Sequence, residues 1–101
     1  CTFVNATILI DGPINVTIQN CKFGENGAST SIRITGISKR HIIAFNAGTG
    51  YTGEFIYADD NVTISTFVGN VGSSAAANVV NYKAPGGSVA TGNIGVVTAR
   101  P

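Results

Sequence analysis

Apolar and polar residues alternate along the chain in short segments, a pattern typical of β-strands with one buried face. The first three such segments are Ile8-x-Ile10, Val16-x-Ile18 and Cys21-x-Phe23, and polar residues or glycine separate them. No segment keeps apolar residues at the spacing i, i+3, i+4, i+7 over ten positions, as an amphipathic helix would. The pattern therefore predicts an all-β protein built from short strands.

The same arrangement returns at regular intervals. One series has steps of 24, 23 and 23 and consists of Ile10, Ile34, Tyr57 and Val80. Val16-x-Ile18 returns as Val62-x-Ile64, 46 positions later. A third series has steps of 20, 22, 22 and 22 and consists of Phe3, Phe23, Phe45, Phe67 and Val89. The shared period near 22 predicts about four stacked coils of a β-solenoid, because one coil buries its inner face only against the next.

Alternation also predicts which side chains of the first strand of each coil face inward. The expected inward residues are Ile8, Ile10, Ile32, Ile34, Phe55 and Tyr57. Leu9, Arg33 and Ile56 lie between them and are expected to face outward in one column. Two large aliphatic side chains beside the apolar stem of an arginine would be unusual on a lone solenoid, so this column is predicted to be a subunit interface.

Two further expectations concern the inside and the corners of the coils. The third series predicts that Phe23, Phe45 and Phe67 lie close together inside. Asn15 and Asn61 are expected to open the second strand of their coils, because asparagine tolerates left-handed backbone and its side chain can hydrogen-bond along a stack.

The stretch ILIDGPINVTIQNCKF, residues 8–23, resembles a coil of the right-handed parallel β-helix proteins, the pectin-lyase-like superfamily. Their loose signature is I-x-I-x-G-x-x-N-V-T-I-x-N-C-x-F, and the likeness extends over residues 1–70. The third coil keeps Asn61-Val62-Thr63-Ile64 but has Asp59-Asp60 where glycine is usual. The second coil keeps Gly36 but has Lys39-Arg40-His41 in place of Asn-Val. The resemblance implies a right-handed parallel β-helix.

The C-terminal part departs from this pattern at Pro85-Gly86-Gly87. We expect residues 1–84 to form the coils and residues 85–101 to form an irregular last coil or a capping or oligomerisation segment. The chain opens on Cys1 and contains no methionine, so we interpret it as a piece of a longer β-helix.

Composition narrows the function classes. Only 11% of the residues are charged and the net charge is +1, which gives little electrostatic attraction to nucleic acid or anionic membranes. No run of 18 apolar residues exists, so membrane insertion is not expected. The two cysteines, Cys1 and Cys21, and the single His41 have no metal-ligand spacing, so no metal or other cofactor is expected. We predict two free thiols, stacked one coil apart.

Three carboxylates are candidates for catalysis, namely Asp11, Asp59 and Asp60. Glycoside hydrolysis needs two carboxyl groups that flank the scissile bond. Asp11 and Asp59 follow equivalent strands two coil steps apart, which spaces them by about 10 Å. The alternative interpretation makes Asp59 and Asp60 turn residues. Lyases of the similar family use calcium-binding acids and a basic residue on an outer sheet face, whereas the corresponding outward positions here are Thr2 and Lys22.

Saccharide binding has its own candidate residues. Tyr51 lies in the glycine-rich loop 48–53 and is the candidate for stacking on a sugar ring. The loops 24–31, 47–53 and 69–76 would follow the third strand of each coil and form one exposed polar wall, which is predicted to bind saccharide together with Tyr51. Lys39-Arg40-His41 is interpreted as a polar turn, with contact to an acidic glycan as the alternative.

The resemblance favours a segment of a phage-type tailspike or tail fibre, outside the cell or on the virion surface, that forms a homotrimer and recognises cell-surface polysaccharide. A fragment of a pectate-lyase-like lyase or hydrolase is the first alternative, and a non-enzymatic β-helix adhesin is the second. The segment alone is not expected to be an enzyme. The sequence leaves open whether the full-length protein cleaves polysaccharide, as a glycosidase or a lyase.

Overall fold

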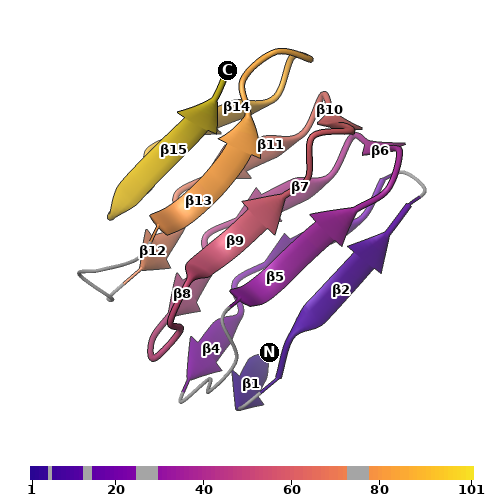
Figure 1. Cartoon of the computed structure of the whole chain (residues 1–101). Helices are drawn as coiled ribbons and strands as arrows, with labels where there is room; N and C mark the ends of the chain where they lie inside the picture. Colours follow the sequence, from indigo (N-terminus) through magenta and orange to yellow (C-terminus); the bar gives the residue numbers. More distant parts are fainter. Residues whose placement is uncertain (5, 13–14, 25–29, 73–77) are drawn as a thin grey trace.

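The chain folds into a parallel β-solenoid of about three turns (Figure 1). The computed structural model describes residues 1–4, 6–12, 15–24, 30–72 and 78–101, and within them every regular element is a strand. All strand pairs in these residues are parallel, and partners come from successive turns. The prediction of an all-β parallel solenoid is therefore confirmed. No helix in the described residues is long and apolar enough to cross a membrane.

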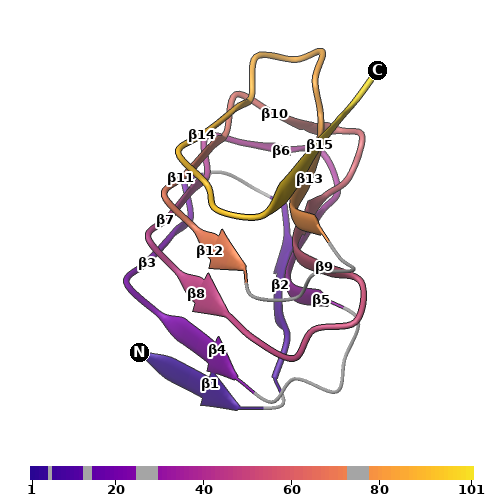
Figure 2. The ribbon, with the colours of Figure 1, turned by 90° about the vertical axis from the view of Figure 1, so that its left-hand side faces the viewer.

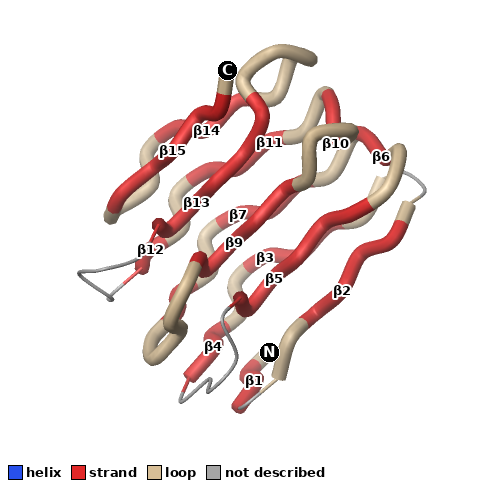
Figure 3. The backbone as a smooth tube through the Cα atoms, in the orientation of Figure 1, coloured by secondary structure: helices blue, strands red, loops and turns tan. Residues whose placement is uncertain are grey.

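Four sheets form the walls of the solenoid, and Figure 3 shows their strands joined by short turns. The five-stranded sheet contains β2 (Ile8–Asp11), β5 (Thr30–Thr35), β9 (Glu54–Ala58), β13 (Asn78–Lys83) and β15 (Val96–Arg100). A second sheet contains β3 (Thr17–Gln19), β7 (Ile42–Ala44), β11 (Thr66–Val68) and β14 (Val89–Thr91). A third sheet contains β1 (Thr2–Val4), β4 (Lys22–Gly24), β8 (Ala47–Gly48) and β12 (Val71–Gly72), which face the viewer in Figure 2. A small sheet pairs β6 (Ser38–Lys39) with β10 (Val62–Thr63).

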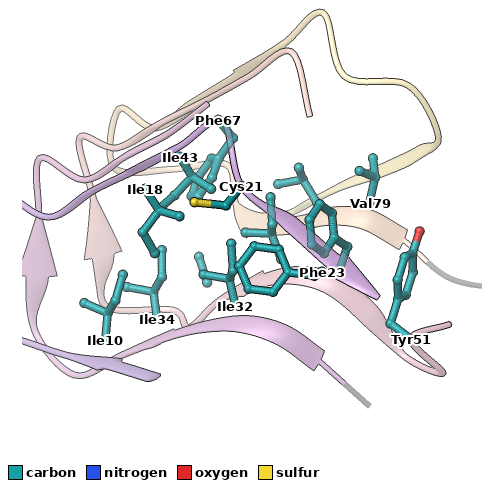
Figure 4. Packing of buried hydrophobic residues seen from close by; sticks show 14 of the residues in the cluster. Ile10, Ile18, Cys21, Phe23, Ile32, Ile34, Ile43, Tyr51, Phe67 and Val79 are labelled. Carbon is teal, nitrogen blue, oxygen red and sulfur yellow. The ribbon is translucent and has the colours of Figure 1, made fainter. Parts of the chain in front are cut away.

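Large apolar side chains fill the space between these walls (Figure 4). Phe55 of the five-stranded sheet reaches across to the opposite wall at Gly48, where a Cβ atom would lie only 2.5 Å from the ring. The completely buried apolar residues include Phe55, Phe67, Ile32, Ile34, Ile43, Ile56, Val79 and Val80. Each buried side chain of this size contributes about 1.5–3 kcal/mol, so the interior is the main source of stability.

The observed register corrects one predicted face. Ile8 pairs with Ile32 and Ile32 with Ile56, so the repeat in this sheet is longer than the expected period near 22. Ile56 is consequently inward and fully buried, whereas Tyr57 pairs with Arg33 on the outer side. The prediction that Ile56 faces outward and Tyr57 inward is wrong. Alternation fails here because Phe55 and Ile56, although adjacent, are both fully buried.

The predicted phenylalanine cluster is also wrong. Phe23 lies in β4 and Phe67 in β11, which belong to different walls, and Ile43 pairs with Phe67 in the position expected for Phe45. Phe45 is 61% exposed and has a left-handed φ of 56° at a corner. Its ring covers Gly69 of the next turn, where a Cβ atom would lie 2.5 Å away. The series with steps of 22 therefore combines residues that occupy non-equivalent positions in their coils.

The two Asn-Val-Thr motifs occupy different places in the coil. Asn15 has the expected left-handed backbone, with φ 61°, and lies at the corner before β3. Asn61 precedes β10, whose Val62 pairs with Ser38. Arg40 and Ile64 are stacked above Asn15 and also have a left-handed backbone conformation. Backbone hydrogen bonds connect the successive turns at this corner. The shared motif is therefore not a mark of structural equivalence.

Residues 85–101 continue the stack. Their strand β14 pairs with β11, and their strand β15 pairs with β13, both in parallel. The last turn is shorter than the one before it, because less chain separates Val80 from its partner Val97 than separates Ile56 from Val80. Residues 85–101 thus add a shorter turn to the stack, and their role as a capping or oligomerisation segment stays a prediction.

Candidate functional site

The outer face of the five-stranded sheet carries a dense row of polar side chains. Strand register places Arg33 beside Tyr57 and Tyr57 beside Asn81, while Lys83 pairs with Arg100. Leu9 pairs with Arg33 and is 61% exposed at one end of the row. Since the inner strands of this sheet are held by ladders on both sides, the side chains on it are presented from a rigid base.

A cation–π cluster lies at the centre of this face. The Arg33 guanidinium carbon is 4.8 Å from the Tyr57 ring centroid, and that of Arg100 is 4.9 Å away. The two arginines come from strands on opposite sides of β9. Each such contact contributes about 0.5–1 kcal/mol at an exposed site. The ring and the two guanidinium groups therefore restrict one another's conformations.

Carboxylates and an amide complete the cluster. Arg33 Nη2 lies 3.4 Å from Asp59 Oδ1, and Arg100 Nη2 lies 3.0 Å from Asp60 Oδ1. Arg100 also donates to the carbonyl oxygen of Ala58 at 2.6 Å and to the side-chain oxygen of Asn81. Asn81 in turn donates to Glu54 Oε1 at 3.2 Å. We call Arg33, Tyr57, Asp59, Asn81 and Arg100 the polar cluster.

The candidate catalytic carboxylates lie on or beside this face, and each has a partner. Thr35 Oγ1 donates to Asp11 Oδ1 at 3.3 Å, while Asp59 and Asp60 pair with arginines. A catalytic role for Asp11, Asp59 and Asp60 stays a prediction. Among the described residues, no group of three His, Cys, Asp or Glu side chains could hold a metal ion.

Tyr51 is not exposed, contrary to the sequence-based expectation. Its side chain is 3% exposed, and its ring stacks on Phe55 with centroids 5.6 Å apart. Gly72 makes room for it, because a Cβ atom there would collide with the tyrosine hydroxyl. Residues 25–29 and 73–77 of the two flanking loops lie outside the described residues. The aromatic residue on the outer face is instead Tyr57.

The structure changes one member of the outward column that the sequence predicts to be a subunit interface. Leu9 and Arg33 face outward, as predicted, but the third member of the column is Tyr57 rather than Ile56. Arg33 and Tyr57 contact each other and Arg33 pairs with Asp59, so the column is not an apolar stripe. A subunit interface through Leu9 and Arg33 stays a prediction.

A buried asparagine ladder, which the sequence analysis missed, runs along one corner. Asn46 Nδ2 donates to Asn70 Oδ1 at 3.1 Å, and Asn70 Nδ2 donates to Asn93 Oδ1 at 3.0 Å. Each amide also donates to the backbone of the preceding turn, as Asn70 does to the Ile43 carbonyl at 2.9 Å. Cys21, whose N–H donates to Asn46 Oδ1, precedes them in the stack. The signal was available, because the three asparagines recur at nearly the same spacing as the isoleucines of the five-stranded sheet.

A second buried ladder runs along the corner before β3, β7, β11 and β14. The Val16 N–H donates to His41 Nδ1 at 3.3 Å, the His41 N–H to Ser65 Oγ at 3.2 Å, and the Ser65 N–H to Ser88 Oγ at 3.2 Å. His41 is fully buried, and burial lowers its pKa below the ordinary value of 6.5. Lys39 and Arg40 are exposed. The Lys39-Arg40-His41 turn is thus polar on the outside only, and His41 is not placed to touch a glycan.

The two thiols are free, as predicted. Cys1 is exposed, whereas Cys21 is buried and its Sγ donates to the Gln19 carbonyl at 3.3 Å. Both border a cavity of about 280 Å³, whose apolar lining comes from Phe3, Ile8 and Ile18.

Comparison with known proteins identifies no relative, since no protein-family model, curated protein or solved structure matches the chain.

Proposed function

We propose that the chain is a β-helix segment of a phage-type tailspike or tail fibre that recognises cell-surface polysaccharide. We further propose that the polysaccharide binds along the outer face of β2, β5, β9, β13 and β15. The observation that carries this proposal is the polar cluster, in which the Tyr57 ring centroid lies 4.8 and 4.9 Å from two guanidinium carbons. The pectin-lyase-like likeness of residues 8–23 supports the assignment to a β-helix family.

The chemistry of the cluster suits a polyhydroxylated ligand. Guanidinium, carboxylate and amide groups supply the planar donors and acceptors that fix the orientation of a polar ligand. Ion pairs and ring contacts already restrict Arg33 and Asp59 in the free protein. Binding therefore costs little additional side-chain entropy. A linear polymer would extend along the row of stacked strands and contact several turns.

Recognition without cleavage fits this segment better than hydrolysis does. Asp59 and Asp60 are both paired with arginines, and Asp11 accepts a hydrogen bond from Thr35. A lyase or hydrolase would use acids on coils outside this segment, and an adhesin would use the same face for binding alone. We retain the depolymerase as a proposal for the full-length protein.

We also propose that the chain forms a homotrimer, which is extracellular or lies on the virion surface. Several large apolar side chains are exposed on or beside the sheet of β3, β7, β11 and β14, namely Ile42, Phe45, Ile64 and Val89. A subunit contact on that wall, in place of the predicted one through Leu9 and Arg33, would leave the polar cluster open to ligand. Exposed apolar patches on a soluble protein commonly mark interaction sites.

Replacing Arg33 with alanine should weaken polysaccharide binding by roughly 10- to 100-fold, because a hydrogen bond from a charged group is worth about 1.5–3 kcal/mol. Affinity would be measured by calorimetric titration with purified bacterial capsular and lipopolysaccharide glycans, starting from a glycan array. Lys22→Ala is the matched control, since Lys22 is exposed on a different wall. The assignment of the face is wrong if Arg33→Ala binds like the unmodified chain or if Lys22→Ala loses as much affinity.

A further inference from the structure

His41 occupies a position in the corner ladder that serine occupies in the next two turns. Ser65 and Ser88 each accept a backbone N–H from the turn before through Oγ. His41 accepts the Val16 N–H through Nδ1 at 3.3 Å. A ring nitrogen that accepts a hydrogen bond carries no proton, so the proton of the neutral imidazole is on Nε2. His41 Nε2 is buried and has no hydrogen-bond partner among the described residues.

Protonation is incompatible with this arrangement. Both ring nitrogens of an imidazolium are donors, so a proton on Nδ1 would face the Val16 N–H, which is also a donor. The charged ring would also be buried without an acceptor at Nε2 among the residues that the structure describes. A serine at this position, as in the next two turns, would show neither effect, because a hydroxyl accepts and donates at any pH near neutrality.

Among the described residues of this corner, none offers the imidazolium a compensating negative charge. The turn below contributes Asn15 and Val16, and the turn above contributes Thr63, Ile64 and Ser65, none of which is ionisable. Lys39 and Arg40 on its own turn are cationic and exposed. The acids that precede β10, Asp59 and Asp60, are paired with Arg33 and Arg100. Burial is the cause of the lowered pKa of His41.

We propose that His41 is a pH-sensitive connection between the first and second coils, closed by the neutral imidazole and opened at Val16 when the ring is protonated. Since His41 is the single histidine, it is also the only side chain in the chain whose ordinary titration falls between pH 5 and 7. Acid should therefore loosen the first coil from the second at this corner.

The expected pH dependence follows from proton binding. When the corner opens, His41 regains its ordinary pKa of 6.5, which is higher than its pKa in the closed state. The open state therefore binds more protons below pH 6.5, and opening becomes easier as the pH falls. The opening constant should be unchanged above this pH, should rise by up to tenfold per pH unit below it, and should level off below the pKa of the closed state.

Amide hydrogen exchange of the full chain, followed by NMR between pH 5 and 7, tests the proposal. After correction for intrinsic exchange, the protection of the Val16 amide should fall with pH by up to tenfold per unit. His41→Asn keeps an acceptor oxygen near the position of Nδ1 and cannot titrate, so its protection should not depend on pH. His41→Ser introduces the residue type found at positions 65 and 88 and should behave in the same way.

Constant protection of Val16 in the unmodified chain would overturn the proposal. An equal loss of protection in both His41→Asn and His41→Ser would also overturn it, because the acid sensitivity would then arise elsewhere. His41→Ala removes the acceptor and should lower Val16 protection at every pH. Unchanged protection in that variant at pH 7 would show that the imidazole does not hold the corner.

Discussion

Replacing Asn70 with alanine should lower the free energy of unfolding by about 3–5 kcal/mol, because each buried polar group left without a partner costs about 1–3 kcal/mol. Asn70 is fully buried. Its Oδ1 accepts the Asn46 N–H at 3.1 Å, and its Nδ2 donates to the Ile43 carbonyl at 2.9 Å. The substitution would leave the Asn46 backbone N–H without its acceptor in the interior, would remove the amide's hydrogen bond to the Ile43 carbonyl, and would interrupt the ladder at its middle.

Urea denaturation measures this loss, and Asn61→Ala is the matched control. Asn61 is exposed before β10, so its substitution should change stability by no more than about 0.5 kcal/mol. A loss of less than about 1 kcal/mol for Asn70→Ala would show that the asparagine ladder does not hold the turns together.

Replacing Ile56 with aspartate should lower the free energy of unfolding by more than about 4 kcal/mol, because an unpaired carboxylate would be buried in the core. Ile56 is fully buried and pairs with Ile32 and Val80. Replacing Tyr57 with aspartate should lower the free energy of unfolding by about 1–2 kcal/mol, because the ring contacts with Arg33 and Arg100 are lost.

The comparison of these two adjacent variants tests the register directly. A coil that is one residue shorter would put Tyr57 inside and Ile56 outside, and the order of the two effects would be reversed. Circular dichroism during thermal unfolding would show which variant loses more stability.

Part of the fold follows from the sequence because residues 8–11 and 32–35 of the first two coils alternate between buried and more exposed positions. Ile10, Ile32 and Ile34 are buried and Leu9 is exposed, as alternation predicts. The prediction fails in the third coil, where Phe55 and Ile56 both turn inward and shift the later residues by one position. A single-residue shift exchanges the inner and outer faces of a strand. Alternation therefore predicts Tyr57 in the core, although it lies on the candidate binding face.

The ladders were missed for a different reason. Polar residues such as Asn46, Asn70 and His41 suggest exposed turns when each is considered alone. In a solenoid, a corner residue of one turn lies above the corner residue of the next, so a buried amide can find its partners along the stack. The Asn-Val-Thr motif causes the opposite error. Its two copies suggest equivalent positions, although they lie at different places in the coil.

The polar cluster was not predictable as a unit. Arg100 reaches the backbone carbonyl of Ala58, far earlier in the sequence, because β15 lies two strands away from β9. The short last turn brings it there, and the departure of residues 85–101 from the repeat conceals this placement in the sequence. The sequence did place Arg33 on the outer face, where it forms one side of the cluster.

The central claim is that the chain is a parallel solenoid whose register places Arg33 and Tyr57 together on one outer face. Nuclear Overhauser contacts between backbone amide and α protons test it most directly. The account predicts parallel-strand contacts that pair Ile32 with Ile56 and Arg33 with Tyr57. Contacts that instead pair Ile32 with Phe55, or antiparallel contacts that join β2 and β3 in one sheet, would contradict it.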